Sequence, residues 1–330
     1  MGYIKRTPLT EFKTQGRGGV GSKGSTTRDD DFLEHMFNAS MHNTLLLFSE
    51  KGKCFWLKVY EIPEGTKTSK GRAIQNVINI EQDDKILAYI NVNNLIDPEY
   101  INNNYIILCT KKGVIKKTSL EAYSRPRQNG VNAITIREDD QLLEARMTNG
   151  SNHIMMAVRS GKAVRFEDAS VRPIGRTASG VRGITLGHDQ DEVVGMVCVE
   201  NENEDILVVS ENGYGKRSKI EDYRLTNRGG KGVKTINITE KTGQLISIKS
   251  VNDVSDLMII TQSGLTIRMS ISSLRILGRT AQGVRLINLK EGDQIASITI
   301  VPAADDVEEV VPNLDENPEV SNENDLQSEE

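Results

Sequence analysis

Residues 110–118 read TKKGVIKKT, a glycine between lysines that opens a basic, partly apolar run. The same pattern of a turn glycine followed by a basic strand recurs in SEKGKCFWLK (49–58), RSGKAVRF (159–166), SENGYGKRS (210–218) and TQSGLTIRM (261–269). The five turn glycines, at positions 52, 113, 161, 213 and 264, are 61, 48, 52 and 51 residues apart. Self-similarity near this period is typical of a chain built from consecutive, similar structural units.

Each unit carries a second glycine, at Gly71, Gly130, Gly180, Gly232 and Gly283. After it comes an alternating run such as VNAITI (131–136) or VKTINI (233–238), in which every other residue is apolar. That alternation predicts a strand with one buried face. A largely apolar strand, such as YIILCT (105–110) or DILVVS (205–210), precedes the next turn glycine.

The opening YIKRTPLTEF matches the start of a unit, so six units are expected to begin near Tyr3, Cys54, Val114, Ala163, Tyr214 and Leu265. Six units of about fifty residues and about four strands each predict an all-β, propeller-like array over residues 1–302. A single unit cannot bury its apolar faces alone, so neighbouring units must pack together. Two stacked β-sandwiches are the competing architecture, and the even spacing favours one six-unit array.

The net charge of −5 hides two parts of opposite sign. Residues 303–330 hold eleven acidic residues and no lysine or arginine, which leaves the rest of the chain with a net charge of about +6. This acidic tail has no amphipathic period and is expected to be disordered. A basic body with an acidic tail suggests a polyanion-binding surface and a tethered competitor for it, although a tail that only aids solubility fits the charge equally well.

The most basic segment of each unit lies between its two glycines. Because the spacing is nearly constant, these segments should fall at equivalent positions of successive units, on one rim. The candidate contact residues there are Lys67, Lys70, Arg72, Arg125, Arg127, Arg172, Arg176, Arg182, Arg224, Arg228, Lys231, Lys234, Arg275, Arg279 and Arg285. The strands before the loops are expected to extend the same cationic track with Lys5, Arg6, Lys58, Lys116, Lys117, Arg165, Lys216, Arg217 and Arg268.

A repeated cationic track is the electrostatic footprint of a protein that binds a phosphate backbone. With no helix to enter a groove and few aromatic residues to stack on bases, contacts should go to phosphates without reading sequence. Two glycine–arginine loops, TQGRGGVG (14–21) and TNRGGKG (226–232), occupy one repeat position, and their glycines let the backbone come close to a partner. A merely solvated rim, or a propeller-type scaffold that binds an acidic protein, are the alternatives.

Other chemistry finds little support in the residues. The three cysteines and four histidines are scattered without CxxC or HExxH spacing, which argues against a metal site and for reduced core cysteines. No run of about eighteen apolar residues could form a membrane-spanning helix, and the start has no signal-peptide core. No nucleophile, triad or other active-site constellation is recognisable.

The first-unit loop QGRGGVG (15–21), followed by DDDFLEHMFNASMHNTLLLFSEKGK, resembles the C-terminal DNA-wrapping domain of the DNA gyrase A subunit, in the type IIA topoisomerase family. The later phrases ENGYGKRSKIEDY and LGRTAQGVRLI are similar to it as well, and the likeness covers residues 3–302. In the family's diagnostic loop, Gln15, Arg17, Gly18, Gly19 and Gly21 match, whereas Gly16 and Val20 stand where the family has basic residues.

The resemblance implies a six-bladed β-pinwheel that wraps double-stranded DNA around its rim and enables ATP-dependent negative supercoiling by a larger enzyme. It implies that the catalytic tyrosine and the ATPase lie elsewhere, so this chain needs no cofactor of its own, and ATP and Mg²⁺ act on other parts. The implied partners are the N-terminal part of gyrase A and the gyrase B subunit in a heterotetramer, in the bacterial cytoplasm. The related topoisomerase IV subunit is the runner-up, since it lacks a recognisable loop of this kind.

Overall fold

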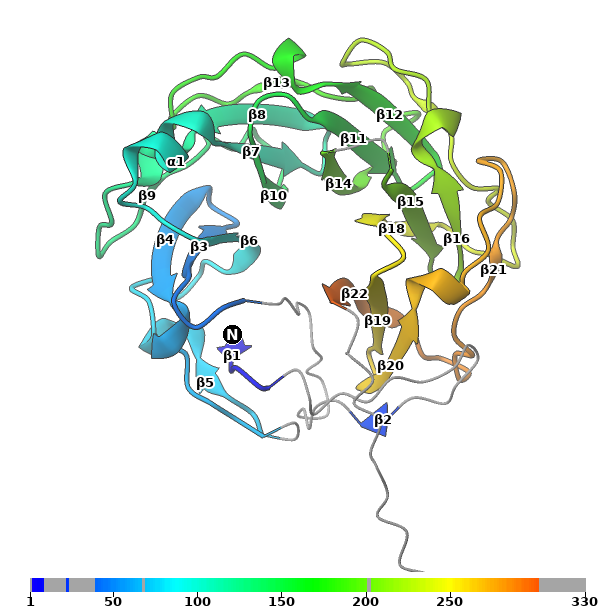
Figure 1. Ribbon diagram of the computed structural model, residues 1–330, viewed down its shortest axis with the longest axis horizontal. Helices are drawn as coiled ribbons and strands as arrows, with labels where there is room; N and C mark the ends of the chain where they lie inside the picture. The colour runs from blue at the N-terminus through cyan, green and yellow to red at the C-terminus, as the bar shows by residue number, and fades with distance from the viewer. Residues whose placement is uncertain (1, 9–21, 24–38, 67–68, 201–202, 303–330) are drawn as a thin grey trace, which may run out of the picture.

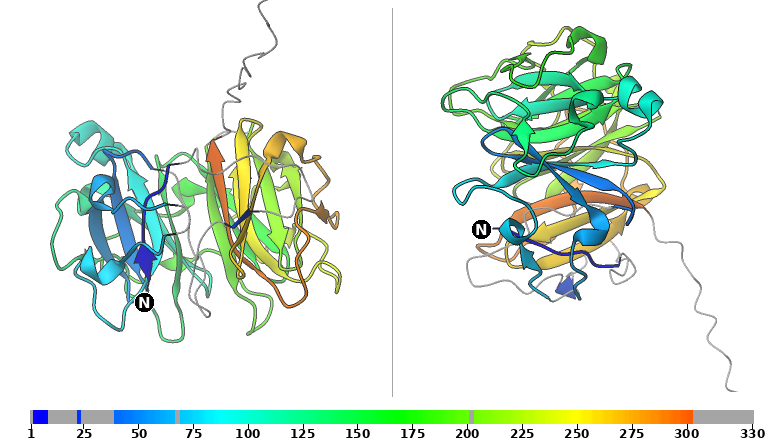
Figure 2. Two further views of the ribbon diagram at one scale, coloured as in Figure 1. Left: turned by 90° about the horizontal axis from the view of Figure 1, so that it is seen from below. Right: turned by 90° about the vertical axis from the view of Figure 1, so that its left-hand side faces the viewer.

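The computed structural model describes residues 2–8, 22–23, 39–66, 69–200 and 203–302. Five four-stranded antiparallel sheets stand around a common centre (Figure 1). Side views place them at one level, as a single ring and not as two stacked sandwiches (Figure 2). The sheets of units 2 to 6 carry the numbers of their units, and their strands are given from the innermost outward (Figure 1). Sheet 2 has β6 (Ile86–Val92), β3 (Thr44–Ser49), β4 (Lys53–Lys58) and β9 (Val131–Asn132); sheet 3 has β10 (Leu142–Thr148), β7 (Tyr105–Thr110), β8 (Val114–Ser119) and β13 (Val181–Arg182). Sheet 4 has β14 (Val193–Val199), β11 (His153–Val158), β12 (Lys162–Glu167) and β17 (Val233–Lys234); sheet 5 has β18 (Leu245–Val251), β15 (Asp205–Ser210), β16 (Tyr214–Lys219) and β21 (Val284–Arg285); sheet 6 has β22 (Ile295–Pro302), β19 (Ser255–Thr261), β20 (Leu265–Ser270) and β2 (Ser22–Lys23).

The first unit departs from the expected six equal blades. Among the described residues it forms only sheet 1, in which β1 (Tyr3–Ile4) pairs with β5 (Arg72–Ala73). The prediction of six four-stranded blades is therefore wrong in number: among the described residues, five sheets have four strands and one has two.

The outermost strand of every four-stranded sheet belongs to another unit. The alternating run after the second glycine was expected to be a full strand, but only its first two residues pair, and they pair with the sheet before, as Val131 does with Cys54. The same exchange links each later sheet to its successor. It also links the two ends of the array, because β2 of the first unit pairs with β20 of the last. The exchange of outer strands therefore involves both the first and the last unit of the array.

The apolar core lies between consecutive sheets. Five clusters of buried residues follow one another around the ring, the largest of them joining Leu46 and Phe48 of sheet 2 to Ile106 and Leu108 of sheet 3. The central strands are buried on both faces, which explains why β7, β11, β15 and β19 read as largely apolar runs and not as alternating ones. Packing between units therefore stabilises the array, as a repeat architecture requires.

Helical structure in the described part of the chain is confined to short turns. A 3-10 helix lies between a strand and the basic loop that follows in five units: η2 (Val59–Glu61), η4 (Leu120–Tyr123), η5 (Asp168–Ser170), η6 (Ile220–Asp222) and η7 (Ile271–Ser273). A further 3-10 helix, η3 (Ile74–Asn76), follows β5. The one described α-helix, α1 (Pro98–Asn103), was not predicted, although Asp97 as its N-cap followed by Pro98 is a readable start signal. The sequence DDDFLEHMF (29–37) favours a helical turn, and it lies outside the described residues.

The turn glycines are required by the backbone. All five have φ between +79° and +82°, a region that residues with a Cβ rarely adopt. At Gly213, a Cβ would also lie 2.7 Å from the carbonyl oxygen of Ile287, where the chain of the next unit crosses the turn. The repeated glycine therefore marks both a tight turn and a close contact between units.

Replacing Gly213 by alanine should lower the free energy of unfolding by about 1–3 kcal/mol, because both the positive φ and the contact with Ile287 are strained. Gly278→Ala is the matched control, since nothing lies within 4 Å of its added Cβ. Urea unfolding measures both variants. Equal stabilities for the two would contradict the requirement for glycine at position 213.

Candidate nucleic-acid interface

The basic loops run along the outer edge of the ring. In sheet 4 the inner neighbour of β12 is β11, and the loop after η6 pairs with the opposite edge of β12 through the bridge Arg165–Leu225 and then through β17. Equivalent bridges join Lys117 to Pro173 and Arg217 to Ile276. The sequence prediction that these loops fall at equivalent positions of successive units is consistent with this geometry.

The described candidate residues are on the surface. Twelve are exposed, namely Lys70, Arg72, Arg125, Arg127, Arg172, Arg182, Arg224, Arg228, Lys231, Lys234, Arg275 and Arg285, and Arg176 and Arg279 are half-buried. Gln15, Arg17, Gly18, Gly19, Gly21 and Lys67, together with the acidic tail, lie outside the described residues.

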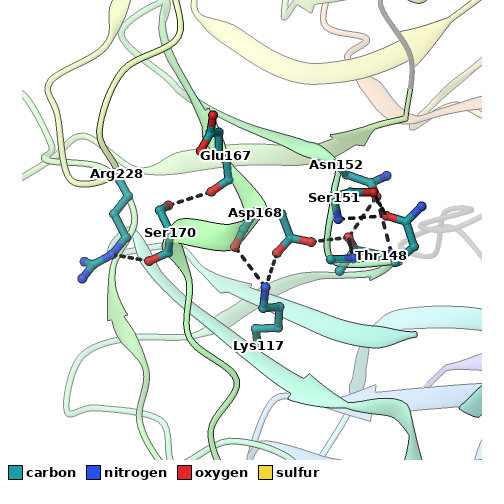
Figure 3. Close-up of polar contacts among 10 residues, drawn as sticks. Lys117, Thr148, Ser151, Asn152, Glu167, Asp168, Ser170 and Arg228 are labelled. Atoms are coloured by element: carbon teal, nitrogen blue, oxygen red, sulfur yellow. Dashed lines mark hydrogen bonds and ion pairs between the residues drawn. The ribbon is translucent and has the colours of Figure 1, made fainter. Parts of the chain in front are cut away.

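Two arginines at equivalent positions tie neighbouring loops together. Arg228 donates from Nε to the carbonyl of Ser170 (3.2 Å) and from Nη1 to the carbonyl of Arg182 (3.1 Å). Arg279 repeats the arrangement one unit later, with bonds to the carbonyls of Asp222 (3.1 Å) and Lys234. Figure 3 shows Arg228 reaching Ser170 at the end of η5. These guanidinium groups hold the loop of the preceding unit in place and are themselves fixed by it.

Backbone bonds reinforce this lateral link. The N–H of Gly229 donates to the carbonyl of Gly183 (2.6 Å), and the N–H of Thr185 donates to that of Gly230 (2.9 Å). One unit earlier, Thr135 donates from Oγ1 to the carbonyl of Thr177 (2.6 Å). We call this row of linked loops, which carries the exposed cations, the outer belt. The backbones of these neighbouring loops are linked to one another, and the guanidinium groups of Arg228 and Arg279 are themselves hydrogen-bonded.

The loop TNRGGKG lines a hollow of about 460 Å³ on the outer belt. Arg224, Arg228 and Lys231 surround it together with Gly229 and Gly230, so three exposed cations and backbone without side chains meet at one concave spot. The N–H of Gly229 already donates to Gly183, so the positive charge of the hollow comes from its three cations.

The buried cations on the strands do not belong to this surface, and that part of the sequence prediction is wrong. Lys116, Lys117, Arg165, Lys216, Arg217 and Arg268 are all buried, with at most 8% of their surface exposed. Lys5 and Arg6 are half-buried and bond the loop of residues 62–69. Only Lys58 of this set is exposed. The sequence pattern could not distinguish an exposed cation from a buried one on these strands. Both faces of each strand are covered, so alternating positions do not separate a solvent-facing side from a core-facing one.

Several of the buried cations join one unit to the 3-10 helix of the next. Lys117 bonds the carbonyl (3.0 Å) and the carboxylate (2.7 Å) of Asp168, which also accepts from Thr148 (2.5 Å; Figure 3). The same strand position supplies Arg165 to the carbonyls of Ile220 and Tyr223, and Arg217 to the carbonyl of Ile271.

In sheet 2 a tryptophan takes this position. Trp56 donates from Nε1 to the carbonyl of Tyr123 (2.9 Å), so an indole does what a lysine or arginine does in sheets 3, 4 and 5. Sequence reasoning missed this role. The signal was available, since a long side chain with a nitrogen donor stands four residues after each of the five turn glycines.

A second set of buried lysines holds the loops from beneath. Lys116 donates to the carbonyls of Ala133 and Arg176 (2.5 Å to the latter), and Lys216 donates to those of Gly278 (2.7 Å) and Arg279 (2.5 Å). Burial lowers the pKa of each ammonium group to about 8. Both therefore remain largely protonated at neutral pH, and their donors are used on loop carbonyls.

A further hollow of about 400 Å³ lies among the innermost strands. Its cations Arg146 and Lys249 share one carboxylate, Glu144. Cys198 also lines it, and burial raises the pKa of this thiol to about 12. Within the described ranges, no three His, Cys, Asp or Glu side chains gather as metal ligands do, and no helix is long and apolar enough to cross a membrane.

Lys117→Met should lower the free energy of unfolding by about 3–5 kcal/mol, because it leaves the fully buried carboxylate of Asp168 without its cation. Adding Asp168→Asn should restore part of the loss, whereas Lys112→Met on the exposed β7–β8 turn should change little. Thermal and urea unfolding measure the three variants. A Lys117→Met protein of unchanged stability would contradict the buried role.

The sequence comparisons agree on one family. The family model of the DNA gyrase C-terminal β-propeller domain matches six segments: 2–40, 43–93, 104–149, 152–200, 204–252 and 255–302. The DNA gyrase A subunit of Staphylococcus epidermidis (strain ATCC 12228 / FDA PCI 1200) is 42% identical over 305 residues, covering 92% of this chain and 34% of the relative. That of Staphylococcus aureus (strain MRSA252) is 43% identical over 320 residues, covering 97% and 35%. The chain thus spans about a third of the length of these relatives.

Solved structures agree on the fold. A DNA gyrase A C-terminal domain superimposes with a TM-score of 0.80 at 25% identity, covering 91% of this chain and 96% of the other. A C-terminal domain of DNA topoisomerase IV gives a TM-score of 0.70, also at 25% identity, covering 91% and 90%. The matched repeats, the curated relatives and the ring architecture lead to one conclusion: this chain belongs to the DNA gyrase C-terminal β-propeller domain family.

Proposed function

We propose that this chain binds duplex DNA through its phosphodiester backbones, without reading sequence, and bends it around the outer belt. The observation that carries the proposal is the belt itself. Exposed cations recur on the outer edge of consecutive units, and hydrogen bonds between loops hold them in register. Charged groups fixed in advance cost less ordering entropy when a partner binds.

The energetics require many contacts. Bending 20–30 base pairs by 40–90° costs of order 1–6 kcal/mol. A single exposed ion pair contributes only about 0–1 kcal/mol, so no single loop holds the bend. Several loops, each releasing counterions from phosphates, supply the free energy together. Backbone contacts alone also account for binding without sequence preference.

The relatives, which are named as the A subunit of DNA gyrase, suggest the wider setting. In that setting the chain acts as the DNA-wrapping part of a type IIA topoisomerase in the bacterial cytoplasm. The remainder of gyrase A, together with gyrase B, supplies the catalytic tyrosine, the ATPase and their ATP and Mg²⁺. The bent duplex is then presented to the catalytic parts, and negative supercoiling follows. This chain contributes binding and geometry, and no chemical step.

The outer belt can be tested with paired charge removals. Arg172→Ala with Arg275→Ala should weaken binding equally for unrelated duplex sequences. The slope of log Kd against log salt should fall by about 0.9 for each phosphate that is no longer bound. Lys112→Ala with Lys290→Ala is the control, because it removes two exposed charges from other loops. Fluorescence anisotropy in a salt series measures both. If the two pairs lose equal affinity and slope, the belt is not the binding surface.

The two glycine–arginine loops should differ in what they do. We propose that TQGRGGVG of the first unit acts as a latch, where the DNA path closes, whereas TNRGGKG contributes affinity midway. Arg17→Ala should then lower energy transfer between dyes on the two ends of a long duplex, while affinity for a short duplex barely changes. Arg228→Ala with Lys231→Ala should do the reverse. In reconstituted gyrase, Arg17→Ala should reduce supercoiling more than relaxation. Loops that behave alike in both assays would exclude the latch.

A further inference from the structure

Three consecutive units expose an apolar residue at the same position of the outer belt. Pro173, Leu225 and Ile276 are the residues that bridge to Lys117, Arg165 and Arg217 on sheets 3, 4 and 5. All three are exposed, Leu225 to 45% and Ile276 to 44%. Isolated surface apolar residues are ordinary, but here they recur at one repeat position on the edge where the cations lie.

Each of these residues directly follows an exposed arginine. The pairs are Arg172–Pro173, Arg224–Leu225 and Arg275–Ile276. A partner attracted by the guanidinium groups therefore meets an apolar side chain one residue away. In the first unit the corresponding bridge joins Arg6 to Glu64, whose side chains form an ion pair (2.8 Å), so the described apolar track is limited to three units.

The apolar residues are also held firmly. The N–H of the residue after each one donates to the carbonyl of the buried cation on the strand: Ile174 to Lys117 (2.9 Å), Thr226 to Arg165 (2.9 Å) and Leu277 to Arg217 (2.8 Å). Side-chain hydroxyls donate to carbonyls at the same places, Thr118 to Ile174 (3.1 Å) and Ser218 to Leu277 (2.7 Å). The exposed side chains thus project from a backbone that is fixed to the sheet.

We propose that Leu225 and Ile276, with Pro173, pack against the deoxyribose faces of the minor groove of the bound duplex. This inference rests on the proposed function and adds a second type of contact to it. Proteins that bend DNA place apolar side chains on the minor-groove side, where the sugar edges and base steps offer the apolar surface that phosphates do not. The neighbouring arginines supply the charge that brings the two backbones to this position.

The salt dependence of DNA binding distinguishes these apolar contacts from the electrostatic contacts of the outer belt. Apolar contacts release no counterions, so their loss should lower affinity without changing the salt slope. Leu225→Ser with Ile276→Ser should weaken binding to a mixed-sequence duplex by about fivefold at every salt concentration, since each change removes apolar area buried on binding. Arg224→Ala with Arg275→Ala should instead reduce the slope.

The control pair is Val254→Ser with Ile96→Ser. Both residues are more exposed than Leu225, at 73% and 89%, and neither lies in a basic loop of the belt. Anisotropy titrations across a salt series, with unfolding curves to verify that all variants are folded, give the comparison. The control pair should bind as the unchanged protein does.

Two results would overturn the inference, and they are distinguishable from failure of the proposed function. If the serine pair binds with unchanged affinity while the arginine pair loses affinity, DNA is bound but these apolar residues do not touch it. If the serine pair lowers the salt slope, its effect is on charge placement and not on apolar packing. If neither the arginine pair nor the serine pair affects binding, the belt does not bind DNA, and the proposed function itself fails.

Discussion

The ring depends on a row of donors, each of which reaches from one unit into its neighbour. In four units, the strand after the turn glycine carries a long side chain with a nitrogen donor at its end. This side chain reaches the 3-10 helix of the next unit. Lys117, Arg165 and Arg217 do this with a charge, and Trp56 does it without one. Because a buried carbonyl left unpaired costs about as much as a lost hydrogen bond, the interaction orients each helix and fixes the loop that follows it. The outer belt has its shape because this inner row of donors holds it.

Cationic side chains therefore have two roles, one beneath the surface of the protein and one at it. Guanidinium and ammonium groups beneath the surface bond backbone carbonyls, and those at the surface remain exposed beside them. Arg228 stands between the two sets, with two nitrogens bonded to the neighbouring loop and an exposed side chain at the edge of the hollow. A surface prepared in this way loses little freedom on binding, which favours a rigid template over an adaptable one.

The spacing of the turn glycines was sufficient to predict an array of similar β-units. The positive φ at Gly213 and its equivalents explains why glycine recurs at that position. The position of the loop arginines could be predicted from the same period. The exchange of outer strands could not, since VNAITI reads as a full strand whether it pairs with its own sheet or with the one before. The burial of Arg217 could not be predicted either, because a basic residue on a strand looks the same whether it faces water or a carbonyl.

The joints between units have a mechanical consequence. Within the described residues, five buried clusters join consecutive units, one at each joint from the first unit to the last sheet. Because packed interiors have low compressibility and transmit strain, these units behave as one stiff arc. A stiff polymer held against that arc would have to take up the curvature of the protein, since the arc would not flatten to follow the polymer.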